Sequence, residues 1–318
     1  VSEGCSSFAY ASGSDSYFPA GPGVAAVAGV PAPGMTATFG RVSRTGDGFG
    51  GTVAHVGPLG ASPRDLALFL EATSGEDKDD ELTRGNPGFV PGWLEGSLRR
   101  GVRGLRIGVL EDEIAFASKE TQRACDDALR SLEHDGAELV KVALVNAKHA
   151  PAIGYVTISI EAFVSLKAAM EDDWASLGPD LQLLLRVMST FEPGDYLDAQ
   201  CLRAGLRRDV ATLLRDVDVL ALPTTLRAAP KVTDAEVRDG MTDTAEIASA
   251  CRYAFLGNLT GLPAGTAPVG TDTRGMPLGL QIMADAWDEA TVLQVLAQLE
   301  RTGVARVPKP HAYAALLG

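Results

Sequence analysis

The sequence predicts an α/β fold, a three-layer α/β/α arrangement in which helices cover both faces of a mixed, mostly parallel sheet. Short apolar runs of strand length alternate along the 318 residues with amphipathic segments of helical spacing. Residues 105–142 have the order strand, helix, strand. The run Val217–Leu222 is apolar throughout, which is typical of a strand buried on both faces.

The first half of the chain supplies one helix and one βαβ unit. Ser62-Pro63, an apolar stripe and Gly75 predict a helix with an N-cap, a proline in its first turn and a glycine stop. Leu105–Leu110 alternates like a strand, residues 124–132 repeat at helical spacing, and Glu138–Val142 starts a second strand. This order favours a parallel pair joined by a right-handed crossover.

The second half predicts helices first and a strand pair later. Helical spacing appears over 158–170, 181–188 and 196–214, and again over 245–255 and 290–301. Two strands are expected at 264–269 and 278–283, joined through a turn at 272–275.

Composition and charge restrict the function classes. The chain carries 28 Lys and Arg against 41 Asp and Glu, a formal net charge of −13. Because this field repels phosphate, no nucleic acid partner is expected. No run approaches the roughly 18 uninterrupted apolar residues of a membrane span, so none is expected. The four cysteines and four histidines show no metal-ligand spacing, so no metal site is expected.

Residues 1–38 differ in composition from the rest of the chain. They are rich in Gly, Ala, Ser and Pro and contain no Lys or Arg. We expect a divergent N-terminal segment, 1–38, followed by the main domain, 39–318. The first basic residue, Arg41, comes too late for the positive start of a secretory signal, which makes the cytoplasm the expected location.

Several motifs occur in a characteristic order. Gly40-Arg-Val-Ser-Arg44 and His55-Val-Gly-Pro-Leu59 come first, then Val217–Thr225, Asn258-Leu-Thr-Gly-Leu-Pro263 and Gly279-Leu-Gln281. Together they resemble the amidase signature family of serine hydrolases, which cut carboxylic amides. The resemblance covers the chain from about residue 40 to residue 309. It implies that family's α/β/α fold, incomplete at the N-terminus, as in a truncated member.

A run in the middle of the chain narrows the resemblance. Asp195-Tyr-Leu-Asp-Ala-Gln-Cys-Leu-Arg203, together with Phe255-Leu-Gly-Asn258, is most similar to the branch that contains plant-type fatty acid amide hydrolases.

The resemblance implies hydrolysis of an amide C–N bond to acid plus amine or ammonia, without metal or cofactor, by a Ser-Ser-Lys triad. A serine hydroxyl needs a base, and a lysine can be that base only if its pKa falls well below about 10.4. The first lysine here is Lys78, after the Gly-Arg-Val-Ser-Arg block, whereas the family's base precedes that block. The glycine-rich stretch with the bridging serine is also missing. We therefore expect impaired or absent catalysis.

The family's nucleophile loop reads Gly-Ser/Thr-Asp-Thr/Ser-Gly-Gly-Ser, and only its start is recognisable. The matching residues are Gly13, Ser14, Asp15 and Ser16, followed by Tyr17, Phe18 and Pro19. Two bulky residues thus replace the glycines that bring bare backbone to the substrate, and a proline, with no hydroxyl and no N–H, replaces the serine. Ser14 and Ser16 are candidate substitutes for the nucleophile, although a solvated turn explains the same residues. A truncated or frame-shifted coding sequence would explain this loss.

Three polar residues are candidates for lining a pocket. Thr224, Thr225 and Gln281 stand at strand ends, where they would either face a small-molecule amide or serve backbone hydrogen bonds. Two other functions stay open: a non-catalytic remnant or binding protein, and the amidase subunit of a tRNA-dependent amidotransferase. An incomplete sheet would leave an unpaired edge or apolar surface, which predicts self-association.

Overall fold

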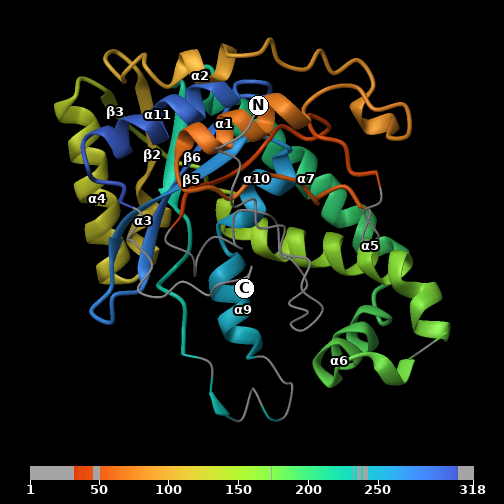
Figure 1. The fold of residues 1–318 in the computed structure, drawn as a ribbon. Coiled ribbons are helices and arrows are strands. Elements are labelled where there is room, and N and C mark those ends of the chain that lie inside the picture. The colour runs from red at the N-terminus through yellow and green to blue at the C-terminus, as the bar shows by residue number, and fades with distance from the viewer. Residues whose placement is uncertain are drawn as a thin grey trace, which may run out of the picture.

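The computed structural model describes residues 32–45, 51–172, 174–231, 233, 234, 238 and 243–306. In this part of the chain the strands form one six-stranded sheet in the order β1-β5-β6-β4-β2-β3 (Figure 1). The strands are β1 (Gly34–Thr36), β2 (Arg106–Leu110), β3 (Glu138–Val142), β4 (Val219–Pro223), β5 (Ala264–Thr271) and β6 (Pro277–Ala284).

The sheet is mixed, as expected, but it is not mostly parallel. The pairs β2·β3 and β2·β4 are parallel, whereas the pairs β1·β5, β5·β6 and β4·β6 are antiparallel. The turn after Thr271 explains the difference. Asp272 N–H donates to Met276 O at 2.8 Å, and Gly275 has a φ of +81°. This tight hairpin reverses the chain, so β6 runs against both β5 and β4.

Each predicted helical segment is helical for the most part, but α5 begins at Ala150 and not at Ile158, and α2 and α3 were not predicted. They are α1 (Pro63–Thr73), α2 (Trp93–Ser97), α3 (Glu111–Phe116), α4 (Lys119–His134), α5 (Ala150–Asp172), α6 (Pro179–Met188), α7 (Pro193–Leu213), α9 (Thr244–Cys251), α10 (Ala254–Thr260) and α11 (Glu289–Arg301). The start of α1 confirms the predicted cap, because the Ser62 side chain accepts from Asp65 N–H and Pro63 occupies the first turn.

Two hydrophobic cores lie on opposite faces of the sheet. One lies between the sheet and α1, α4 and α11, and the other between the sheet and α5, α7 and α10 (Figure 1). Alternate residues of β4 enter each core: Val219 and Ala221 belong to the first, Leu220 and Leu222 to the second. All five residues of this strand are buried, which confirms the prediction of a strand covered on both faces.

The helix predicted over 245–255 is two helices. The chain leaves α9 after Cys251 and re-enters a helix at Ala254. Between them, the hydroxyl of buried Tyr253 donates to Glu113 O at 2.7 Å. We attribute the break to this contact, because the change of direction lets Tyr253 reach α3.

The described residues include one segment that is long and apolar enough to span a membrane, by length and composition only. This segment, Ala147–Leu166, has a mean hydropathy of 1.2, and a third of it is buried. It forms most of α5, which packs against α7 and α10. The buried part of α5 thus serves helix packing, whereas Val164 of the same helix is 68% exposed.

Candidate functional site

A strip of polar side chains crosses three neighbouring strands. Thr224 directly follows β4, and its N–H donates to Gly279 O of β6 at 2.9 Å. Two residues further along β6, Gln281 pairs with Thr266 of β5. Residues that lie opposite each other or two apart share a face of a sheet. Thr224, Thr266 and Gln281, here named the polar strip, therefore point toward the core under α10.

The two threonines of the polar strip are joined to each other. Their hydroxyls are hydrogen-bonded, and Thr266 Oγ1 donates to Leu280 O at 3.3 Å. Gly279 leaves room for this pair, because a Cβ at this position would lie 2.5 Å from Thr224 Oγ1. Thr225 has a different use: its hydroxyl donates to Arg227 O at 2.9 Å and stabilises the turn after β4.

Gln281 is the polar residue of the strip with an unmet hydrogen bond. Its side chain is fully buried, and Nε2 donates to Tyr253 O at a long 3.5 Å. The other amide atom, Oε1, has no hydrogen-bond partner in the described part of the chain. Leaving a buried acceptor unsatisfied costs about 1–3 kcal/mol. Such an atom needs an explanation in a folded protein.

Apolar side chains from two helices continue the wall beyond β4. Tyr155 of α5, Leu226 after β4 and Ile247 of α9 are partly buried and pack against the same core. Burial raises the pKa of the Tyr155 hydroxyl and of the Cys251 thiol. Both groups are therefore uncharged at neutral pH, and Cys251 lacks the thiolate character of a nucleophile.

A charge pair lies where β2 passes into α3. The Arg252 guanidinium donates to Glu113 Oε2 at 3.1 Å and lies 4.0 Å from the centre of the Phe116 ring. Both side chains are mostly buried. The pair lies near the carboxyl end of β2, an edge where α/β sheets commonly bind ligands. No periodicity or motif in the sequence predicts that Arg252 contacts Glu113 and Phe116.

The signature motif has a clear structural use. The Asn258 side chain donates from Nδ2 to Val53 O at 2.6 Å, and Phe39 N–H donates to Gly261 O at 3.0 Å. Gly261 ends α10 with a φ of +78°, which favours glycine. The motif thus fastens the backbone that leaves β1 and the segment around Val53 to the end of α10.

Arg203 of α7 clamps the same region. This buried side chain donates from Nε to Leu259 O and from Nη2 to Thr52 O, both at 2.7 Å. Glu161 of α5 holds Thr52 from the other side, accepting from its N–H at 2.8 Å. Burial lowers the pKa of Arg203 to about 10, so the guanidinium remains charged at neutral pH. Sequence reasoning noted the Asp195–Arg203 run but missed this clamp.

The Gly-Arg-Val-Ser-Arg block is also fixed by a buried contact. Arg41 forms a two-point ion pair with Glu289, 3.0 Å from Nη2 to Oε2, and the two side chains are 3% and 0% exposed. The guanidinium lies 4.2 Å from the Phe89 ring centre and 4.5 Å from that of Trp287. Trp287 has a φ of +71°, a strained conformation for a bulky residue. This contact, which the sequence did not reveal, ties β1 to the start of α11.

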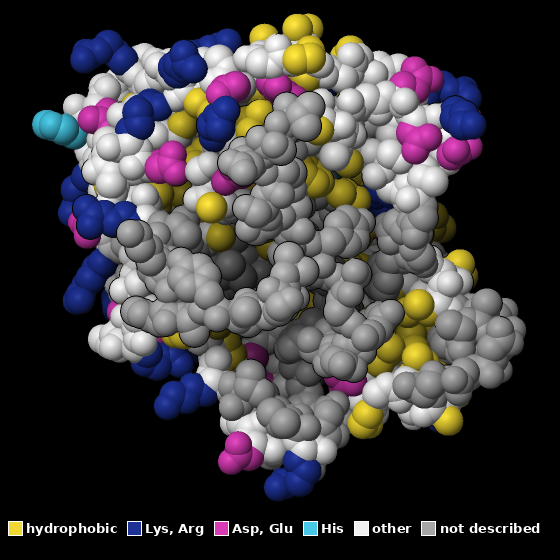
Figure 2. Space-filling view, in the orientation of Figure 1, with side chains coloured by type: hydrophobic (Ala, Val, Ile, Leu, Met, Phe, Trp, Pro, Cys, Tyr) yellow, Lys and Arg dark blue, Asp and Glu magenta, His cyan; other side chains and the backbone are white. Residues whose placement is uncertain are grey.

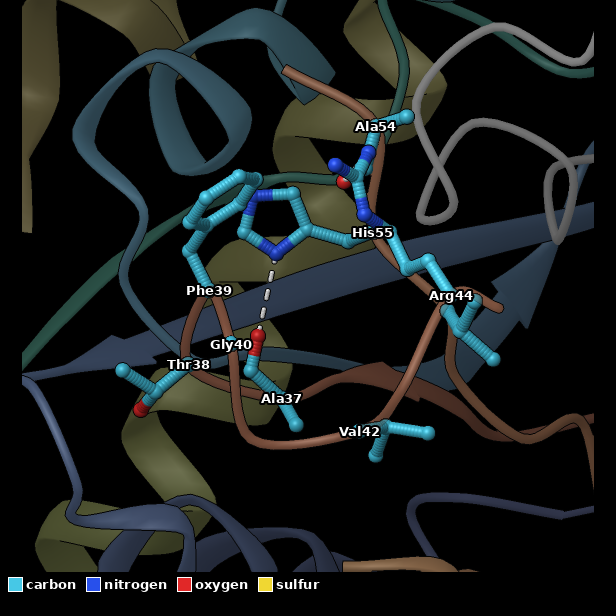
Figure 3. Close-up of a pocket in the computed structure, with 9 residues that line it drawn as sticks. Ala37, Thr38, Phe39, Gly40, Val42, Arg44, Ala54 and His55 are labelled. Atoms are coloured by element: carbon cyan, nitrogen blue, oxygen red, sulfur yellow. Dashed lines mark hydrogen bonds between the residues drawn. The ribbon is translucent and has the colours of Figure 1, made fainter. Parts of the chain in front are cut away.

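A small pocket lies between residues 37–44 and residues 54–56 (Figure 3). It has room for little more than a water molecule and is lined by Ala37, Thr38, Phe39, Gly40, Val42, Arg44, Ala54, His55 and Val56. His55 donates from Nδ1 to Ala37 O at 3.0 Å, which sets the tautomer of the neutral ring. Its Nε2 is shielded from solvent and has no hydrogen bond in the described chain. Burial lowers the pKa of His55 to about 4.

The remaining predicted site residues lie outside the described residues. These are Gly13, Ser14, Asp15 and Ser16 of the nucleophile-loop remnant. Among the residues that the structure does describe, no three His, Cys, Asp or Glu side chains are grouped as metal ligands.

Comparison with known proteins reveals the family. The family model described as Amidase matches residues 25–293. Fatty acid amide hydrolase of Medicago truncatula is 30% identical over 290 residues, which cover 90% of this chain and 48% of that protein. A glutamyl-tRNA(Gln) amidotransferase subunit of Granulibacter bethesdensis is 33% identical over 298 residues, covering 84% of this chain and 57% of that one.

A solved structure agrees with these sequence relatives. A protein from a vestigial complex, described as revealing the evolutionary origins of an s-triazine catabolic enzyme, superimposes with a TM-score of 0.80 at 27% identity. The match covers 91% of this chain and 62% of that one. The chain spans about half the length of the curated relatives that it matches. Motif order, fold and these matches agree: the chain belongs to the amidase family.

Proposed function

We propose that the reaction of this scaffold is hydrolysis of a carboxylic amide C–N bond to acid plus amine or ammonia. We further propose that the 318-residue chain is catalytically impaired. Membership of the amidase family supports the first statement. The second rests on one observation: Pro19 stands at the serine position of the nucleophile loop.

The chemistry explains why this observation matters. Amide hydrolysis needs an activated nucleophile, a base and donors aimed at the developing oxyanion. Pro19 removes a hydroxyl and an N–H at one position. Of the described cysteines, Cys125 and Cys251 are no substitute, because burial raises the pKa of both thiols, that of Cys125 to about 12.

The proposal also covers the residues that line the pocket, the organisation of the chain, its location and its partners. Thr224, Thr225 and Gln281 belong to the wall that a small-molecule amide would approach. The separate N-terminal segment predicted over 1–38 would end before β1, because Gly34–Thr36 pair with β5 in the sheet of the main domain. We place the protein in the cytoplasm, with no nucleic acid partner and with a tendency to self-associate.

Two other functions compete with this one. A non-catalytic binding protein would keep the fold and bind amides without turnover. An amidotransferase subunit is favoured by the 33% identity to the Granulibacter bethesdensis protein. That function predicts glutamine hydrolysis only when partner subunits are expressed together with the chain.

Serine labelling tests the proposal. The purified chain is incubated with a fluorophosphonate probe and, separately, with a panel of primary and N-alkyl amides. We expect no labelled serine and no released acid, and the same result for the Ser14→Ala and Ser16→Ala variants. A labelled serine together with turnover of any amide would show that the chain is a competent enzyme.

A further inference from the structure

Gln281 of the polar strip carries a hydrogen-bond acceptor that the described chain does not use. Within the described chain this buried side chain makes one long contact, from Nε2 to Tyr253 O at 3.5 Å, and none from Oε1. Removing a buried acceptor that has no partner also removes its desolvation penalty of about 1–3 kcal/mol. Oε1 therefore gives the described fold no hydrogen bond and is available as an acceptor.

The neighbouring threonine adds a second acceptor. Thr266 uses its hydroxyl hydrogen on Leu280 O. In the Thr224–Thr266 contact the donor is therefore Thr224, whose own oxygen keeps its lone pairs. Thr224 lies opposite Gly279, two residues along β6 from Gln281 and on the same face. Such diagonal neighbours in a sheet are about 7–8 Å apart.

A single group that binds both acceptors must supply two polar hydrogens. A carboxylate offers no hydrogen and is repelled by both oxygens. An ammonium has the hydrogens but would bring a full charge into a buried place without an anionic partner in the strip, at a cost of several kcal/mol. A neutral carboxamide meets both conditions.

We propose that Gln281 Oε1 and Thr224 Oγ1 accept the two hydrogens of a primary carboxamide NH₂ group. This inference rests on the proposed function, because it deepens the substrate class of the same site. It separates substrate from product: hydrolysis turns the carboxamide into a carboxylate, which has no N–H for either acceptor. The strip therefore favours binding of the amide and release of the acid.

Ligand-dependent melting tests the assignment on the full chain. The probes are hexanamide, N,N-dimethylhexanamide, hexylammonium and hexanoate, and the chains are wild type, Gln281→Met and Thr224→Val. We expect hexanamide alone to raise the melting temperature of the wild type. We expect Gln281→Met to weaken hexanamide binding at least tenfold, and Thr224→Val to weaken it several-fold. Undiminished hexanamide binding in Gln281→Met, stabilisation by the dimethyl amide or hexylammonium, or no hexanamide binding to the wild type would each overturn the assignment.

A second glutamine separates binding from folding. Gln294 of α11 is also buried, but its Nε2 donates to Gly101 O at 2.5 Å. Without ligand, Gln294→Met should melt below the wild type, whereas Gln281→Met should melt at or above it. If Gln281→Met melts as low as Gln294→Met, Gln281 is a structural residue and the inference fails.

Release of hexanoate, followed in the same samples, keeps the two proposals distinguishable. Binding without turnover supports both the acceptor site and impaired catalysis. Hexanoate release together with equal hexanamide affinity in the wild type and in Gln281→Met would overturn the acceptor site while supporting amide hydrolysis.

Discussion

At the scale of single residues, a few buried polar groups hold the segments around β1. Asn258 and Arg203 donate hydrogen bonds to the carbonyls of residues 53 and 52. His55 in turn donates to the carbonyl of Ala37, one residue after β1. Each contact joins a side chain to a backbone carbonyl. Such bonds are directional, so they fix the path of a loop that apolar packing alone would leave free.

The buried imidazole of His55 makes stability depend on pH. Burial, opposed by the nearby Ala37 and Asn258 backbone and assisted by Arg44 and Arg203, lowers the pKa of His55 from 6.5 to about 4. The unfolded chain thus binds the proton more tightly. The contribution of His55 to stability is complete above pH 6.5 and is lost as the pH falls from 6.5 to about 4. The loss amounts to about 3 kcal/mol at most.

Urea unfolding between pH 7 and pH 4 measures this effect. His55→Asn should lose less free energy of unfolding over this range than the wild type. His134→Asn, at an exposed position in the last turn of α4, should behave like the wild type. If the free energy of unfolding falls with pH by the same amount in all three proteins, protonation of His55 does not destabilise the folded chain.

At the scale of elements, the end of α10 depends on a single backbone conformation. Gly261 has a φ of +78°, and a Cβ there would lie 3.3 Å from Phe39 Cβ. We expect Gly261→Ala to lower the free energy of unfolding by about 1–3 kcal/mol. Gly205 lies within α7, where an added Cβ would meet no heavy atom within 4 Å. Gly205→Ala should instead raise stability by about 0.5–1 kcal/mol.

Chemical denaturation of both glycine variants checks this contrast. Because one substitution should destabilise and the other stabilise, a general effect of added alanine cannot produce the expected pair of results. A stable Gly261→Ala variant would show that the end of α10 tolerates another conformation.

The elements predicted best are those whose signals are local. The cap at Ser62, the buried pattern of β4 and the βαβ order of β2, α4 and β3 are all confirmed, because spacing and turn residues determine them. The prediction of a mostly parallel sheet was wrong. After its hairpin with β5, β6 also pairs with β4, and local spacing does not reveal this pairing.

The candidate site was predictable only in part. Thr224 lies at the end of β4 as predicted, but Gln281 lies inside β6 (Pro277–Ala284) and not at a strand end. The pairing of β4 with β6 places both residues on one face of the sheet. By contrast, Arg41 and Glu289 are separated by 248 residues, and no periodicity connects positions so far apart. The Glu113–Arg252 pair escaped prediction for the same reason. The nucleophile-loop residues remain predictions.

At the scale of the whole molecule, apolar side chains stay exposed on helices that pack together. Val164 of α5, Leu183 and Val187 of α6 and Leu197 of α7 are 51–68% exposed. The same helices lie at one end of the fold, away from β2 and β3 (Figures 1 and 2). Exposed apolar surface of this kind favours association.

Sedimentation velocity over a range of concentrations tests self-association. We expect the wild type to associate and the combined variant Val164→Ser, Leu183→Gln, Val187→Gln and Leu197→Gln to shift toward the monomer. Val145→Ser, at a residue that is 74% exposed outside these helices, should associate like the wild type. A wild type that is monomeric at every concentration would refute the expectation.

The pairing of β1 with β5 has a consequence for synthesis on the ribosome. Gly34 to Thr36 lie beside residues 264–266, and Arg41 pairs with Glu289. At translation rates of roughly 5–20 residues per second, this edge of the sheet stays unpaired for about 10–50 seconds after β1 has left the exit tunnel. A nascent chain with such a delay has a long window for chaperone binding, and its final compaction can begin only after Glu289 has been translated.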